Sequence, residues 1–294
     1  MQFEVREIEK LEIRVLLDNS GGTGYGLLGT HGLSMLIRTQ YESQWSNVLF
    51  DVGPNADVLL NNMERLGVSP SGIDCIVLSH SHYDHAGALV KVVEAIGKRP
   101  LAIVTHPDAF RVTYGLRPSV KVIGTLCSDR AAVEAQGGVF VSVSEPMEVA
   151  PGLFTTGTVP RSTGEPTGVK TFCVRDDGSC TEDPIFDDIS LVAKVGDCGL
   201  SVITGCSHSG IVNILRHCTQ LAGCNDLELV IGGFHLLGAT DDRMSWTMSE
   251  FAAMKPSRVV SGHCTGFDAE ARFRQQMGSA YESMFTGKAI RVPR

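Results

Sequence analysis

Short apolar runs bounded by glycine and polar residues recur along the whole chain and predict β-strands. These runs cover residues 11–17, 32–38, 48–51, 73–78, 101–104, 187–193, 199–204, 227–231 and 258–261. Several of the segments between them carry apolar residues at helical spacing and end at a glycine. These segments cover residues 56–66, 88–96, 129–136 and 211–221, and a further helical stretch follows residue 266. Such an alternation of strands and helices is typical of α/β proteins.

The two halves of the chain, roughly 1–145 and 146–294, show the same succession of strands and polar turns, and we expect one domain across all 294 residues. The segment 165–184 is rich in Gly, Thr, Asp and Pro and is predicted to run over the surface. The glycine-rich segment 21–26 is not followed by the Gly-Lys-Ser/Thr of a phosphate-binding loop. It is therefore either a lid over the substrate or a plain surface loop.

The richest polar segment follows the predicted strand at 73–78 and contains His80, His82, Asp84 and His85. Side chains two apart in an extended segment point to the same side, so His80 and His82 can bind one metal ion. Asp84 and His85 follow as the chain turns, and they can face a second ion. Imidazole and carboxylate groups are common ligands of zinc, manganese and iron. A turn with merely solvated histidines is the alternative, but the buried strand before it and the glycine after it favour a metal site.

Three further predicted strands end in a histidine that is flanked by Gly or a small polar residue, namely His208, His235 and His263. The carboxyl ends of the strands are where open α/β folds place their sites. A single histidine at a strand end is more often structural, so it is the repetition of the pattern that favours a shared site. The remaining candidates lack the pattern and are predicted not to bind metal: His31, His106 and His217.

The composition narrows the classes of function. With 25 basic and 33 acidic residues the net charge is −8, and no basic run follows a phosphate backbone, so nucleic acid is not an expected partner. No stretch approaches the ~20 apolar residues of a membrane span, and the charged N-terminus lacks a signal-peptide core. The nine cysteines never form Cys-x-x-Cys, which favours reduced thiols. We expect a cytosolic protein with a small-molecule substrate; the oligomeric state stays open.

The motif His80-x-His82-x-Asp84-His85 after a buried strand resembles the signature of the metallo-β-lactamase superfamily. Other segments, from about residue 13 to 266, resemble one branch, the proteins similar to 7,8-dihydropterin-6-yl-methyl-4-(β-D-ribofuranosyl)aminobenzene-5′-phosphate synthase. These segments are Asp18-Asn19, His31-Gly32-Leu33-Ser34, Leu49-Phe50-Asp51-Val52-Gly53, Thr156-Gly157-Thr158-Val159-Pro160-Arg161, Asp187-Asp188, Thr204-Gly205-Cys206-Ser207-His208-Ser209-Gly210, Gly232-Gly233-Phe234-His235-Leu236 and Gly262-His263-Cys264-Thr265-Gly266.

The resemblance implies a four-layer αβ/βα sandwich that holds two divalent metal ions at one edge of its sheets. It assigns three ligands to each ion: His80, His82 and His208 to the first, and Asp84, His85 and His263 to the second. Zinc is the favoured metal, although the same donors also serve manganese and iron.

Two features of the chain depart from the wider superfamily. Cys206 stands where many members have an aspartate that bridges the ions, so a thiolate ligand and a buried structural cysteine both remain open. The usual third histidine of the first site lies near Gly157, where this chain has none. The assignment of His208 therefore follows the branch alone.

Two adjacent ions lower the pKa of a shared water toward neutrality and so supply a metal-bound hydroxide. The first hypothesis is therefore a dinuclear metal-dependent hydrolase of a small-molecule ester, thioester, lactone or phosphoester. Asp84 would relay a proton, and His235 would contact substrate, stabilise an oxyanion or orient a ligand. Asp51 and Asp188 would orient ligand imidazoles or form turns, and Arg161 is either an anion binder or a solvated arginine. The alternatives are the synthase activity of the branch name, a diiron redox protein and a ligand-binding protein without turnover.

Overall fold

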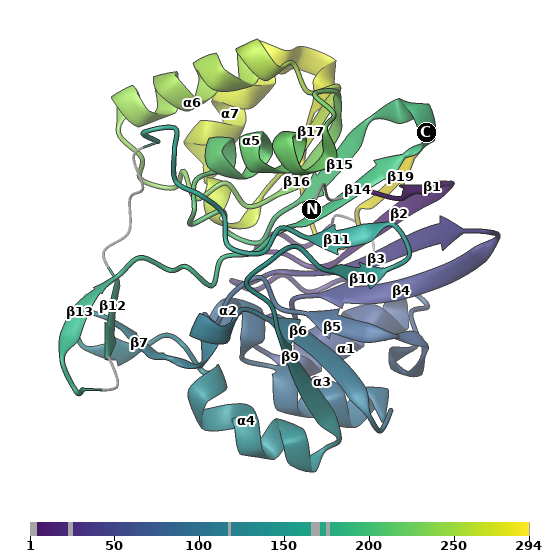
Figure 1. Ribbon diagram of the computed structural model, residues 1–294, viewed down its shortest axis with the longest axis vertical. Helices are drawn as coiled ribbons and strands as arrows, with labels where there is room; N and C mark the ends of the chain where they lie inside the picture. The colour runs from purple at the N-terminus through teal and green to yellow at the C-terminus, as the bar shows by residue number, and fades with distance from the viewer. Residues whose placement is uncertain (1–4, 23–25, 117–118, 166–170, 175–176, 294) are drawn as a thin grey trace.

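The computed structural model describes residues 5–22, 26–116, 119–165, 171–174 and 177–293. Two large β-sheets pack face to face, and helices cover the outer face of each sheet (Figure 1). This is the predicted four-layer αβ/βα sandwich. None of the helices in the described part of the chain has the length and apolar character that crossing a bilayer requires. All nine cysteines lie within the described ranges, and each is a free thiol.

The first sheet has the strand order β19-β2-β3-β4-β5-β6-β9. Its strands are β19 (Ala289–Val292), β2 (Lys10–Leu17), β3 (Ser34–Tyr41), β4 (Gln44–Phe50), β5 (Cys75–Val77), β6 (Leu101–Thr105) and β9 (Gly138–Ser142). The helices on its outer face are α1 (Ala56–Arg65), α3 (Leu89–Ile96) and α4 (Leu126–Ala135), and the short helix α2 (Tyr83–Ala86) lies at its edge (Figure 1).

The second sheet has the order β10-β11-β14-β15-β16-β17-β18, with β1 beside β14. Its strands are β10 (Glu148–Ala150), β11 (Leu153–Thr155), β14 (Leu191–Val195), β15 (Leu200–Ile203), β16 (Leu227–Gly232), β17 (Arg258–Ser261), β18 (Tyr281–Ser283) and β1 (Glu7–Ile8). The helices on its outer face are α5 (Ile211–Ala222), α6 (Asp241–Met254) and α7 (Phe267–Met277).

Alternation along the strands explains why both faces of each sheet are covered. In β3, Met35 and Ile37 belong to the core between the two sheets, whereas Leu36 belongs to the core beneath the helices. The same alternation makes β15 bury Ile203 between the sheets and Val202 beneath α5. A strand that is apolar on both sides is stable only when both sides are buried, so this pattern requires a layer on each face.

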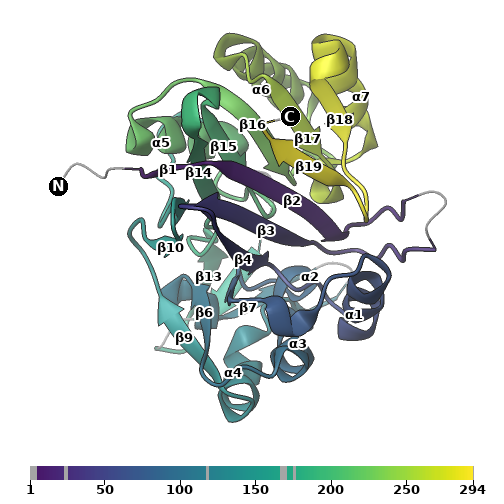
Figure 2. The same cartoon turned by 90° about the vertical axis from the view of Figure 1, so that its right-hand side faces the viewer.

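The two ends of the chain cross between the halves. The N-terminal β1 pairs with β14 of the second sheet, and the C-terminal β19 pairs with β2 of the first (Figure 2). The two halves, divided near residue 145, therefore each contribute a terminal strand to the other half's sheet, which ties them together through backbone hydrogen bonds.

A small sheet with the order β13-β12-β7-β8 lies beside α2, and the sequence did not indicate it (Figure 1). Its strands are β13 (Cys180–Asp183), β12 (Thr171–Val174), β7 (Val112–Gly115) and β8 (Lys121–Val122). The segment 165–184, predicted as a surface excursion, thus supplies two strands, while residues 166–170 and 175–176 lie outside the described ranges. Helix α6 was also missed, and α4 begins three residues earlier than predicted.

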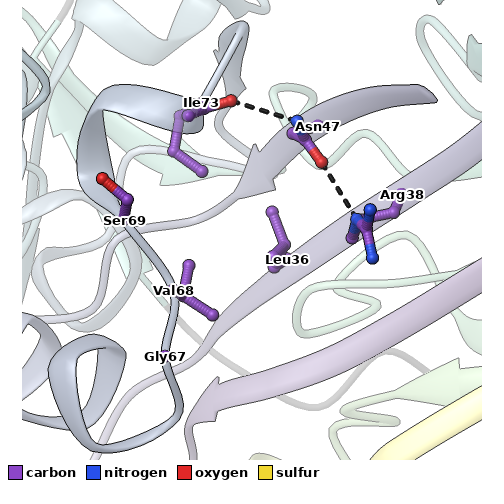
Figure 3. A pocket seen from close by; sticks show the side chains of 8 residues that line it. Leu36, Arg38, Asn47, Gly67, Val68, Ser69 and Ile73 are labelled. Carbon is purple, nitrogen blue, oxygen red and sulfur yellow. Dashed lines mark hydrogen bonds between the residues drawn. The ribbon is translucent and has the colours of Figure 1, made fainter. Parts of the chain in front are cut away.

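A surface pocket lies between β3, β4 and the segment 67–73 (Figure 3). Its charged residue is Arg38, whose guanidinium donates to Asn47 Oδ1 at 3.1 Å and to Glu12 Oε2 at 2.8 Å. The same guanidinium lies 4.5 Å from the ring centroid of Trp45. Because the charge of Arg38 is already neutralised, this pocket offers no unpaired charge to a ligand. The candidate catalytic residues lie instead at the strand ends.

Candidate metal centre

The carboxyl ends of β5, β15, β16 and β17 bring histidines from both sheets to one edge of the sandwich. Two groups of side chains there place one donor atom each within 4.8 Å of the others. We call them the three-histidine cluster and the mixed cluster. The three-histidine cluster consists of His80, His82 and His208, and the mixed cluster of Asp84, His85, Cys206 and His263. The six residues predicted as ligands thus fall into the two groups that the resemblance implies, and Cys206 joins the second.

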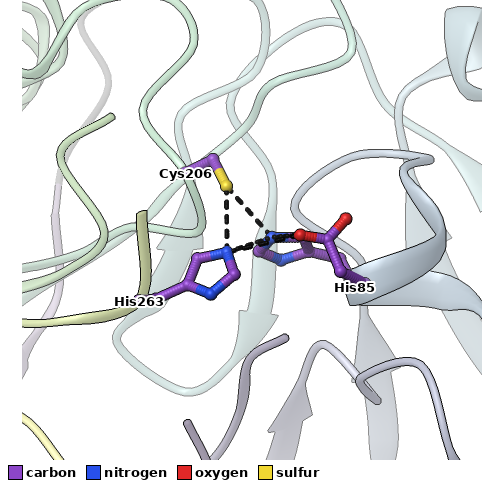
Figure 4. Close-up of side chains that lie close together, drawn as sticks. His85, Cys206 and His263 are labelled. Carbon is purple, nitrogen blue, oxygen red and sulfur yellow. Dashed lines mark hydrogen bonds and ion pairs between the residues drawn. The ribbon is translucent and has the colours of Figure 1, made fainter. Parts of the chain in front are cut away.

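The donor atoms of the mixed cluster converge closely (Figure 4). His85 Nε2 lies 3.1 Å from His263 Nε2 and 3.1 Å from Cys206 Sγ, and Cys206 Sγ lies 3.3 Å from His263 Nε2. Asp84 Oδ2 lies 3.7 Å from His85 Nε2 and 3.5 Å from His263 Nε2. All four side chains are buried. A carboxylate, two imidazoles and a thiol around one point suit zinc and related ions.

The three-histidine cluster lies next to the mixed cluster. His80 Nε2 lies 3.2 Å from His208 Nε2, and the His82 ring centroid lies 4.5 Å from that of His80. Nε2 of His82 is buried and has no hydrogen-bond partner among the described residues. The rings of His80 and His85 are 4.2 Å apart, so the two clusters adjoin.

Asp51 orients a ligand ring in each cluster. Its Oδ2 accepts a hydrogen bond from His85 Nδ1 at 2.7 Å and another from the Ser79 hydroxyl at 2.7 Å. The Ser79 oxygen in turn lies 2.9 Å from His80 Nδ1 and accepts its proton. In both rings the proton therefore sits on Nδ1 and the lone pair of Nε2 points into the cluster, as in metal-binding histidines.

The donor sets therefore fit metal ions. Imidazole lone pairs that face one another at 3.1–3.2 Å repel unless a proton or a metal ion lies between them, and buried neutral rings favour the metal ion. Burial and the neighbouring histidines hold the pKa values of His80 and His208 well below the usual range, so both rings are neutral donors. Burial opposes ionisation of Asp84, but His85 and His263 hold its pKa below the usual range, so its carboxylate is charged.

The backbone of the centre is strained where its side chains converge. Asp51, Ser207, His235 and His263 have positive φ angles of 59°, 63°, 48° and 51°. Non-glycine residues seldom adopt this region, and when they do they cluster at functional sites. Gly205 is also required, since a Cβ there would lie 2.2 Å from Ser79 Oγ.

The contacts of Asp188 and Arg161 bear on the alternative roles predicted for each of them. Asp188 accepts from the backbone N–H of Ser209 at 2.8 Å and so fixes the segment that carries His208, as a turn-forming residue would. Burial raises its pKa to about 6. The Arg161 guanidinium donates to the carbonyl oxygens of Pro184 and Ile185, so its contacts give no support to an anion-binding role.

The ring of His235 lies 4.5 Å from that of His208, outside both donor groups. Burial and the charge of Arg243 lower its pKa to about 4. His106 and His217 belong to neither cluster. Their rings are hydrogen-bonded to Thr158 Oγ1 and to the Thr156 carbonyl, respectively.

Three contacts of the centre were not predicted. Asn19 Oδ1 accepts from His263 Nδ1 at 2.9 Å, and Asp187 Oδ2 accepts from the Ser81 N–H at 2.9 Å. His31, half-exposed, places Nε2 3.3 Å from Asp84 Oδ2 and stacks on His263 with ring centroids 5.2 Å apart. All three lie in segments that carry the family resemblance, so a signal was present, but nothing in it indicated these contacts.

Comparisons with known proteins agree with this geometry. A model of the metallo-beta-lactamase superfamily matches residues 29–166. The 7,8-dihydropterin-6-methyl-4-(beta-D-ribofuranosyl)-aminobenzene-5'-phosphate synthase of Methanocaldococcus jannaschii is 32% identical over 295 residues, which cover 99% of this chain and 100% of that protein. The structure of Tm1679, a metal-dependent hydrolase of the beta-lactamase superfamily, is 30% identical with a TM-score of 0.80 over 95% of this chain and 98% of that one. The metallo-beta-lactamase fold protein YhfI from Bacillus subtilis is 12% identical with a TM-score of 0.56 over 96% and 99% of the two chains, and supports the fold alone. The chain belongs to the metallo-β-lactamase superfamily.

Proposed function

We propose that this protein is a dinuclear metal-dependent hydrolase of a small-molecule ester, thioester, lactone or phosphoester. The observation that carries the proposal is the pair of adjoining donor clusters, whose buried ligand atoms point toward two neighbouring centres. We assign His80, His82 and His208 to one ion and Asp84, His85 and His263 to the other, with zinc as the favoured metal. A net charge of −8 supports a small molecule, and not a nucleic acid, as the substrate.

Two bound divalent ions supply a nucleophile from water near neutral pH and polarise the oxygen of the substrate that receives charge. The protein's own groups then position and move protons. Asp84 is charged and lies at the side of the mixed cluster that faces His31, so it can accept a proton from the attacking water. His31 is half-exposed and within reach of Asp84, which offers that proton a path to solvent.

His235 acts on the other side of the centre. Its low pKa keeps the ring neutral at pH 7, so it donates a hydrogen bond and does not carry a full charge. A neutral N–H beside the three-histidine cluster can stabilise the oxygen on which negative charge develops.

The test is a screen of the metal-reconstituted protein against p-nitrophenyl esters, phosphodiesters, thioesters and lactones. We expect turnover of at least one class, its loss in His82→Ala and Asp84→Ala, and its retention in Asp57→Asn, a control on the exposed surface of α1. Elemental analysis should find about two metal ions per chain. Absence of metal, or activity that survives both site variants, would contradict the proposal.

A second candidate is the synthase reaction named for the M. jannaschii protein, because the similarity to it spans 99% of this chain at 32% identity. Its test is to incubate the loaded protein with a ribofuranosyl-aminobenzene phosphate and a dihydropterin whose 6-methyl carbon carries a phosphate ester, which leaves as the C–N bond forms. A joined product in the mass spectrum, absent with Asp84→Ala, would favour the synthase over the hydrolase.

A further inference from the structure

Arg243 is a buried arginine beside the metal centre that has no ion pair among the described residues. It lies in the first turn of α6, the residue as a whole is 6% exposed, and its Nε–H has no hydrogen-bond acceptor among the described residues. Burial of an unpaired charge is unfavourable, because the lost hydration is not replaced by a counter-charge. A fold that keeps such a group needs a reason for it.

The neighbours of Arg243 place it against the metal centre. Its charge reaches His235 and Cys264, residues at the ends of β16 and β17. Cys264 follows the ligand His263 directly and bonds to the carbonyl of Cys206 at 3.5 Å. The turn between His235 and α6 packs on the same segment, since the Leu237 N–H donates to the Cys264 carbonyl at 3.1 Å. Arg243 lies in the first helical turn that follows it.

Glu165 is the nearby carboxylate, but it forms no ion pair with Arg243, and its Oε1 is buried without a hydrogen-bond partner among the described residues. Its Oε2 accepts from the backbone N–H groups of Val212 and Asn213, at 2.9 and 3.2 Å, in the first turn of α5. Burial raises the pKa of Glu165 to about 7, so it is only partly ionised near neutral pH. It therefore compensates the charge of Arg243 incompletely.

Elsewhere the same protein neutralises a comparably buried arginine. The side chain of Arg258 is 13% exposed, and its Nε lies 2.6 Å from Glu282 Oε1. The more exposed Arg216 on α5 is paired with Glu250 at 2.5 Å. Arg243 thus differs from these two arginines in having no ion pair among the described residues.

We propose that Arg243 binds an oxyanion of the substrate, a phosphate or a carboxylate, beside the metal centre and apart from the bond that is cleaved. A guanidinium presents a planar fork of donors that matches these groups in a bidentate contact. The inference rests on the proposed function in taking the centre as the place of the reaction. The phosphate in the name of the M. jannaschii protein's product agrees with it.

The experiment is calorimetric titration of inorganic phosphate, and separately of propionate, into the metal-reconstituted full-length protein. Arg243→Met should weaken binding of at least one probe by about 10- to 100-fold, because a hydrogen-bonded contact to a charged group is worth about 1.5–3 kcal/mol. Arg243→Lys keeps the positive charge but not the planar fork of donors. Its affinity for the probe should lie between those of the wild type and Arg243→Met. Arg216→Met is the matched control and should bind like the wild type.

Metal content and melting temperature separate this role from a structural one. Removal of a buried unpaired charge should leave the melting temperature of Arg243→Met unchanged or raised. Unchanged affinity for both probes in Arg243→Met would overturn the proposal, and so would loss of the fold in both variants. If phosphate alone depends on Arg243, the substrate is phosphorylated; if propionate alone does, it carries a carboxylate.

The two proposals can fail separately. Binding that depends on Arg243 in a protein that hydrolyses nothing would leave this inference standing and remove the hydrolase. Hydrolysis by a protein whose binding of both probes does not depend on Arg243 would leave the hydrolase standing and remove this inference.

Discussion

The two clusters of the metal centre adjoin but differ in chemistry. The three-histidine cluster offers neutral imidazoles only, whereas the mixed cluster offers a charged carboxylate and a thiol beside two imidazoles. Their supports differ as well. His85 and His263 each have a direct hydrogen-bond acceptor on Nδ1, while His80 reaches Asp51 only through Ser79. Opposite charge and firmer orientation both favour the mixed cluster as the tighter metal site.

This difference suggests a division of labour. An ion held by neutral ligands keeps more of its positive charge and is the stronger Lewis acid toward a substrate oxygen. The neighbouring His235 is on that side of the centre. An ion bound by the mixed cluster would be the better one to hold the water, since Asp84 and His31 offer a proton path there.

Removal of one cluster at a time should have the largest effect. We expect His85→Ala and His208→Ala each to lower hydrolysis by about 10³-fold, because one ion contributes several kcal/mol to the transition state. His208→Ala should leave about one ion bound per chain, and His85→Ala should leave less, since its remaining site is the weaker one. Elemental analysis after dialysis checks this. Equal numbers of bound metal ions in the two variants would show that the clusters do not differ in metal affinity.

Asp51 should be the next most sensitive position, because it supports both clusters. Asp51→Asn tolerates the positive φ of 59°, but its amide can accept on one side only. Metal affinity should therefore fall by up to about 100-fold, more in the mixed cluster, where the contact is direct. Competition with a chelator measures the two affinities. Asp74→Asn, which alters a carboxylate with exposed contacts only, is the control.

The same distinction between direct and indirect contacts explains what the sequence could predict. His80, His82, Asp84 and His85 are adjacent along the chain, so their spacing alone indicates a metal site. His31 meets Asp84 only because the loop before β3 packs on α2, where the Leu33 N–H donates to the Asp84 carbonyl at 3.2 Å. No local pattern encodes such a contact.

The fold shows the same limit. The central strands of the large sheets were predicted because they are apolar on both faces, which is a strong local signal, whereas β18 and β19 at the sheet edges were not. Strand β13 is polar, with the sequence Cys-Thr-Glu-Asp, and pairs with β12, which in turn pairs with the distant β7. Strands of this kind depend on their partners more than on their own composition.

The role of Cys206 is the third test of the comparison, with a smaller expected effect. If the thiol binds metal, Cys206→Ser should weaken the mixed cluster by about 20-fold, within the range for a contact to a charged group. The cobalt-substituted protein should also lose its sulfur-to-metal absorption. Cys264→Ser is the matched control, since Cys264 is buried beside the centre but outside both clusters. An unchanged cobalt spectrum in Cys206→Ser would make Cys206 a structural residue.

Substitution of Asn19 should have the smallest effect on metal affinity, and that effect should be confined to one cluster. Its Oδ1 accepts from His263 Nδ1, and its other side-chain hydrogen bonds among the described residues are to the His263 carbonyl and the Gly32 N–H. Asn19→Ala should therefore lower metal affinity by about tenfold at most, at the low end for a group that orients a ligand, and in the mixed cluster alone. The transfer of metal to a chelator, followed over time, should show one phase for each cluster, and the change in each phase measures this effect. A matching loss in the three-histidine cluster would mean that the two ions bind cooperatively, so that the difference between the clusters describes their ligands but not their occupancy.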